Sequence, residues 1–151
     1  MTKPALKPDQ VVSTLNNLIE TCRDGQNGYT DAAEHIENPQ IKTFCLEQSR
    51  TRAQFVGELQ QETLSLGGDP ENAGSTAAVL HRAWINLKSA LGGGDHAILA
   101  AAETGEDSAV KAYDNALAEH LPAPIRAIVE RQRHNVKQAH DLVKTMRDQS
   151  K

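Results

Sequence analysis

Aromatic residues are scarce in this sequence: Phe, Tyr and Trp together make up 3% of its 151 residues. So few aromatic rings exclude a stacking platform for single-stranded nucleic acid. The chain also lacks a basic excess, with 16 basic and 20 acidic residues and a net charge of −4. Nucleic-acid binders usually carry a basic face, so we expect no nucleic-acid partner.

Long apolar runs and catalytic motifs are missing as well, and cysteines are few. No run approaches the ~18 apolar residues of a membrane span, and residues 1–8 lack the apolar core of a signal peptide. Two cysteines cannot build a disulfide framework. The sequence holds no Gly-x-Ser-x-Gly elbow, phosphate-binding loop or Cys-x-x-Cys pair. These absences favour a soluble, cytoplasmic protein that has no membrane partner and is not an enzyme.

What the sequence does contain is helical periodicity. Apolar residues recur every three or four positions almost throughout, and no run alternates apolar and polar residues as a strand does. This spacing predicts long helices over 9–36, 39–66, 95–120 and 123–147, with a shorter helix over 75–91. A hydrophobic content of 38% and a charged content of 24% are typical of one globular domain.

Capping residues and glycines mark the ends of these helices. Asn38, followed by proline, suits a helix start, and Gly67 suits the left-handed position after a helix end. Ser75, Thr76 and Asp95 are the candidate caps of the next two helices.

The connections between the helices predict their arrangement. Short links join residues 9–66 into one hairpin and 95–147 into another, and short links force neighbouring helices to run antiparallel. Segment 67–94 must then cross from one hairpin to the other. We therefore predict an all-α protein, an antiparallel four-helix bundle over 9–149 with one long crossover that contains the short helix. An extended tail over 1–8 precedes it.

The two predicted hairpins match one another without gaps at an offset of 84 residues. Tyr29 corresponds to Tyr113 and Gln48 to Gln132, and these positions lie on the apolar faces of their helices. The shared phase across the turn indicates a structural repeat with pseudo-twofold symmetry between the hairpins.

Short strings in both halves carry a family resemblance. They are 18–25 (Leu-Ile-Glu-Thr-Cys-Arg-Asp-Gly) with Gly28-Tyr29, 66–71 (Leu-Gly-Gly-Asp-Pro-Glu), 80–84 (Leu-His-Arg-Ala-Trp) with Leu87-Lys88, and 105–107 (Gly-Glu-Asp) with 110–113 (Val-Lys-Ala-Tyr). Over about residues 11–147 the chain resembles the uncharacterised bacterial four-helix-bundle proteins of the ferritin-like superfamily. The resemblance implies a ferritin-like fold and a loose association with stress proteins, and it implies no established activity.

Ferritin-like di-iron proteins use a Glu-x-x-His motif on two helices, and this motif is absent here. The nearest strings, 47–50 and 130–133, end in arginine, which stays protonated and cannot bind a metal. We therefore expect no resident metal or other cofactor. If iron binds at a degenerate site, its weak candidate ligands are Glu47, Glu103 and Glu106. A mononuclear site assembled from histidines of different helices stays open.

Four polar residues on the apolar faces form a predicted hydrogen-bonded layer. Folding each hairpin at its turn brings Tyr29 level with Gln48, and Tyr113 level with Gln132. Buried phenol and amide groups need partners, since an unpaired one costs about 1–3 kcal/mol. We predict that these four side chains share hydrogen bonds, directly or through water, around the pseudo-twofold axis.

A buried ion pair is the second predicted feature. The hairpin turn and the repeat place Arg52, Cys22 and Glu106 at one height. A lone buried charge is costly and a paired one is tolerated, so we predict that Arg52 neutralises Glu106 where a di-iron protein holds its cations. Glu103 is the second-choice partner. Cys22 and Cys45 lie about 12 Å apart along the helix axis at the usual rise, too far for a disulfide.

The sequence favours a non-enzymatic ferritin-like bundle with a structural or interaction role, linked to stress. The alternatives are an iron-binding bundle with a degenerate site and a bundle that binds a small ligand in its interior. Trp84, the single tryptophan, is expected to anchor the crossover helix, with a homo-oligomer interface as its second interpretation. The sequence alone selects no ligand, oligomeric state or protein partner.

Overall fold

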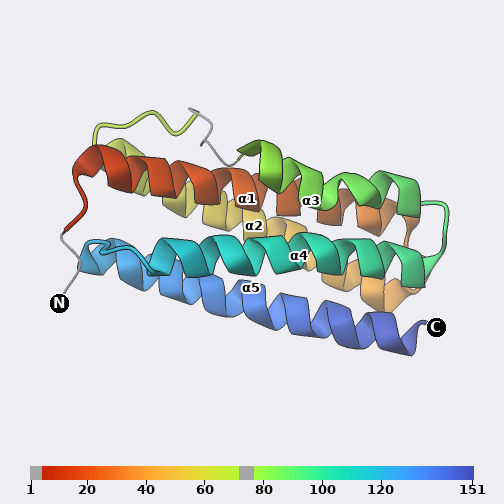
Figure 1. Cartoon of the computed structure of the whole chain (residues 1–151). Helices are drawn as coiled ribbons and strands as arrows, with labels where there is room; N and C mark the ends of the chain where they lie inside the picture. The colour runs from red at the N-terminus through yellow and green to blue at the C-terminus, as the bar shows by residue number, and fades with distance from the viewer. Residues whose placement is uncertain (1–4, 72–76) are drawn as a thin grey trace.

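The computed structural model describes residues 5–71 and 77–151, and the described part of the chain is helical (Figure 1). Its helices are α1 (Pro8–His35), α2 (Pro39–Ser65), α3 (Ala77–Ala90), α4 (Asp95–Leu117) and α5 (Ala123–Gln149). No strand occurs among the described residues, so the predicted all-α class is confirmed.

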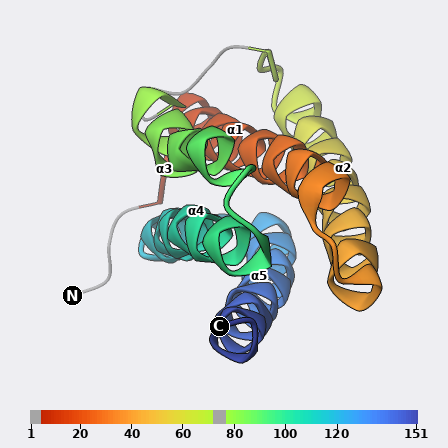
Figure 2. The same ribbon diagram turned by 90° about the vertical axis from the view of Figure 1, so that its right-hand side faces the viewer.

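The helices form two antiparallel hairpins, α1 with α2 and α4 with α5 (Figure 1). Helix α3 runs along the hairpins, and α4 runs antiparallel to α1 (Figure 1). Seen along the helices in Figure 2, α1 lies next to α4, and α3 packs beside both of them. This arrangement creates an interior between the hairpins that is lined by the inner faces of the long helices.

Local chemistry fixes most helix ends. The side-chain oxygen of Asn38 caps α2 as predicted, accepting two backbone N–H groups of its first turn at 2.9 and 3.3 Å. Gly67 has the predicted left-handed backbone, with φ of +78°. The predicted cap of α4 is wrong, because Gly94, with φ of +87°, holds that position. The Asp95 carboxylate instead accepts the backbone N–H groups of Glu37 and Asn38 at 2.8 and 3.0 Å. This contact ties α4 to the link between α1 and α2.

Some predicted helix bounds need correction. Helix α4 ends at Leu117 rather than 120, because the prolines that follow disfavour helical backbone in the residues before them. Helix α5 continues to Gln149 rather than 147. Pro8 is the first residue of α1 rather than the last of the tail, since a missing N–H costs nothing in the first helical turn. The two candidate caps Ser75 and Thr76 lie outside the described residues.

The apolar core consists of two clusters that follow one another along the hairpins. One contains Leu15, Phe55 and Val129, and the other contains Ile36, Ile41 and Leu99, among further residues. On α2 and α4, the buried polar residues Arg52 and Glu106 fall between members of one cluster and members of the other. The core is therefore interrupted at mid-height by a layer of polar side chains.

Candidate functional site

A buried ion pair joins the two hairpins. Nη2 of Arg52 on α2 lies 2.5 Å from Oε2 of Glu106 on α4, and both side chains are 0% exposed. Burial alone would lower the pKa of Arg52, but the charge of Glu106, the hydrogen bond to it and the neighbouring Tyr29 and Cys22 together hold the pKa above its ordinary value. The structure thus brings together the two residues that the sequence pairs, and each compensates the buried charge of the other.

Tyr29 of α1 completes this half of the layer. Its hydroxyl donates to the same Oε2 of Glu106 at 2.9 Å, and the guanidinium carbon of Arg52 lies 5.5 Å from its ring centroid. Burial, and then the charge of Glu106, raise the pKa of Tyr29 well above its usual value of 10. Gly25 makes room for the guanidinium, since a Cβ there would lie 2.5 Å from Nη1 of Arg52.

The other half of the layer contains no fully buried ion pair among the described residues. The Tyr113 hydroxyl donates to Oε1 of Gln132 at 2.7 Å, and Sγ of Cys22 lies 3.0 Å from the same hydroxyl. Because the hydroxyl proton goes to Gln132, the thiol of Cys22 is the donor in its contact with Tyr113. Burial raises the pKa of Cys22 to about 11 and that of Tyr113 well above 10. Nε2 of Gln132 donates to Oε1 of Glu58 at 2.9 Å.

These contacts follow the repeat in the sequence. Tyr29 on α1 reaches Glu106 on α4, and Tyr113 on α4 reaches Cys22 on α1, each partner standing seven positions before the tyrosine of its own helix. Each tyrosine therefore crosses between the hairpins to the equivalent place. Of these two equivalent positions, 106 carries a carboxylate and 22 carries a thiol. The charged side chain of Arg52 contacts the carboxylate.

Gln48 is the member of the predicted layer whose side-chain oxygen makes no direct hydrogen bond within the described residues. Tyr113 and Gln132 bond to one another as expected, but Tyr29 turns to Glu106, and Oε1 of Gln48 has no partner within the described residues. The physical reason is charge: an ionised carboxylate is a stronger acceptor for a buried hydroxyl than a neutral amide. Gln48 is only partly buried, so it does not complete a four-residue layer.

Trp84 docks α3 against the hairpins, as expected from the sequence. A Cβ at either Gly28 on α1 or Gly105 on α4 would overlap its indole ring. The ring also lies edge-on to Tyr29, with centroids 5.6 Å apart. The sequence analysis assigned these two glycines no packing role. A glycine inside a helix destabilises it by about 0.5–1 kcal/mol relative to alanine. Two glycines in the middle of predicted helices were therefore a signal that another side chain packs closely against them.

A di-iron centre does not fit these residues. Glu106 is engaged by Arg52 and Tyr29, and the equivalent position in the repeat is Cys22. Of the other two candidate iron ligands, Glu47 is exposed on α2, and Glu103 pairs with Arg147 at the edge of α4 and α5. The described residues therefore do not supply, in the interior, the carboxylates and imidazoles that two iron ions need.

A model for a domain of unknown function (DUF2383) matches residues 10–119 of the chain. The chain belongs to this family. The match contains α2, α3, α4 and nearly all of α1, and with them the Arg52–Glu106 pair, both tyrosines and Trp84. Helix α5 lies beyond it. A search of curated proteins finds no match for this DUF2383 chain.

Each helix of this DUF2383 chain that falls within the described residues is too short or too polar to cross a membrane.

Proposed function

We propose that this DUF2383 protein is a non-enzymatic ferritin-like four-helix bundle with a structural or interaction role, linked to stress. The single observation that supports it is the Arg52–Glu106 pair, with 2.5 Å between Nη2 and Oε2 and both side chains fully buried. On this proposal the pair lies where ferritin-like proteins hold cations, and the permanent positive charge of Arg52 neutralises the carboxylate there. The Arg52–Glu106 pair then serves to hold the two hairpins together.

The proposal also covers the compartment in which the protein works and its lack of a nucleic-acid partner. The protein works in the cytoplasm, which agrees with two free, buried cysteines that a reducing compartment keeps as thiols. It binds no nucleic acid, which agrees with a net charge of −4.

A small-ligand function has weaker support. One surface pocket is lined by Gly28, Trp84 and Lys88, and another by His120 and Arg126 at the link between α4 and α5. Neither pocket is lined by the two buried tyrosines, so neither opens the polar layer to a ligand. We therefore do not propose a ligand in the interior.

Iron chemistry provides the test. The full-length protein, with any affinity tag removed, is mixed with Fe(II) in air, and Fe(III) formation is followed against buffer alone. We expect the wild type and Glu106→Gln to give the rate of buffer, and the iron content after desalting to be independent of Glu106. Faster oxidation by the wild type that disappears in Glu106→Gln, or two iron ions per chain that depend on Glu106, would overturn the proposal.

A further inference from the structure

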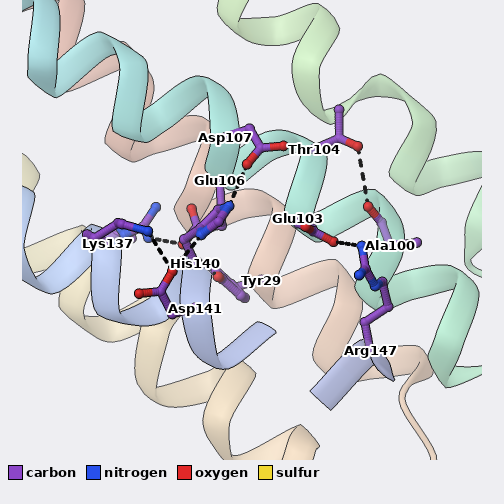
Figure 3. A network of polar contacts seen from close by, with 11 residues as sticks. Tyr29, Ala100, Glu103, Thr104, Glu106, Asp107, Lys137, His140, Asp141 and Arg147 are labelled. Carbon is purple, nitrogen blue, oxygen red and sulfur yellow. Dashed lines mark hydrogen bonds and ion pairs between the residues drawn. The ribbon is translucent and has the colours of Figure 1, made fainter. Parts of the chain in front are cut away.

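A second polar cluster lies at the edge of α4 and α5, where water reaches it. Glu103 and Asp107 stand one turn apart on α4, so their side chains share a face, and His140 meets them from α5 (Figure 3). One ligand atom from each of the three residues lies within 4.8 Å of those of the other two. Asp107 is 63% exposed, in contrast with the fully buried Arg52–Glu106 pair.

The two ring nitrogens of His140 have different surroundings. Nε2 lies 2.5 Å from Oδ1 of Asp107, and Nδ1 lies 3.0 Å from Oδ1 of Asp141 (Figure 3). Lys137 in turn pairs with Asp141 at 2.7 Å. An imidazole whose far nitrogen is held by a carboxylate is the arrangement that orients histidine ligands in metal sites. Nε2 hydrogen-bonds Asp107, so a proton lies between these two groups. A cation that displaces this proton would be bound by the Nε2 lone pair and by the carboxylates of Asp107 and Glu103, while Nδ1–H donates to Asp141.

Glu103 is able to join such a site. Arg147 contacts its Oε2, and the same guanidinium also contacts Asp148 at 2.8 Å. The second oxygen of the Glu103 carboxylate remains a potential ligand, since a carboxylate offers two acceptor atoms. The nearby positive charge of Arg147 opposes a bound cation, so we expect exchangeable rather than permanent binding.

We propose that Glu103, Asp107 and His140 form a mononuclear site for a divalent transition-metal ion. Two carboxylate oxygens and one imidazole nitrogen, with the remaining positions open to water, suit Zn²⁺ and related first-row ions. The ion would join α4 to α5 at the surface. This site is separate from the central layer, and it goes beyond the structural role proposed above.

Calorimetric titration with ZnCl₂ tests the site on the full chain, with any tag removed and bound metal stripped by a chelator. We expect one Zn²⁺ per chain, an affinity at least about tenfold weaker in His140→Ala and Asp107→Asn, and about tenfold weaker in the positioning variant Asp141→Asn. His134→Ala is the matched control, since His134 is exposed on the same helix outside the cluster. It should bind like the wild type.

Two further measurements make the result decisive. Circular dichroism checks that the variants fold, and the absorption spectrum of bound Co²⁺ should change in His140→Ala because a nitrogen ligand is lost. Equal Zn²⁺ affinity in the wild type and His140→Ala, or no binding by the wild type, would mean an ion-pair network only and would overturn the proposal. Loss of Zn²⁺ in Glu106→Gln but not in His140→Ala would refute it and the proposed function together.

Discussion

Removing the guanidinium of Arg52 should destabilise the protein severely. In Arg52→Met, Glu106 keeps its 2.9 Å hydrogen bond from Tyr29 but loses its counter-charge in a place with 0% exposure. Stranding one partner of a buried pair costs about 3–5 kcal/mol. Since a domain is stable by only about 5–15 kcal/mol, this loss is a large fraction of the total.

Removing both charges should cost much less. Arg52→Met/Glu106→Leu leaves no buried charge, and the remaining cost is the Tyr29 hydroxyl without its acceptor, about 1–3 kcal/mol. Adding Tyr29→Phe should recover most of that remainder, because the hydroxyl is then gone. The predicted order of stability is therefore the single variant lowest, then the double, then the triple.

Urea unfolding followed by circular dichroism measures these differences. Arg126→Ala is the control, because Arg126 pairs with Glu130 at 3.1 Å on the surface, where the two side chains are 40% and 55% exposed. Such a pair contributes at most about 1 kcal/mol. The reasoning is refuted if Arg52→Met costs no more than Arg126→Ala, or if the double variant costs the sum of its two single changes.

Three further predictions concern glycine packing, the tyrosines and the cysteines. Gly105→Ala should destabilise the protein by about 1–3 kcal/mol and shift the fluorescence of Trp84. Gly57→Ala should stabilise it by about 0.5–1 kcal/mol, because a Cβ at position 57 would meet no atom within 4 Å beyond its chain neighbours and its own helix backbone. Changes of the same sign for both variants in urea unfolding would contradict this. Burial raises the pKa of both tyrosines well above 10, so stability should hold up to about pH 10, the unfolded value, and fall above it. Phenolate absorbance that appears before helix is lost would be inconsistent with that. Burial raises the pKa of the two thiols to about 11 and about 12, so alkylation at neutral pH should require unfolding. Modification of the folded protein at the rate of a free thiol would argue against it.

The helices and the charge pairing could be predicted from the sequence because their causes are local or pairwise. Periodicity selects helix, and proline, glycine and Asn38 select the ends within a few residues. Folding a hairpin at a short link fixes the height of every residue along it. The repeat relates positions in one hairpin to positions in the other. Since a buried charge requires an opposite charge, the hairpin turn and the repeat together were enough to pair Arg52 with Glu106.

The position of a residue along its hairpin does not determine which neighbouring helix its side chain contacts. Only the tertiary structure decided that. Tyr29 is level with Gln48 along its own hairpin, yet its hydroxyl crosses to Glu106 on the other one. In the same way, His140 on α5 meets Asp107 on α4 only because the packing turns those two helix faces toward each other. Sequence periodicity gives each helix one apolar face, but the rotation of that face against its neighbours is set by the whole core, including the Trp84 ring seated on glycines of two helices.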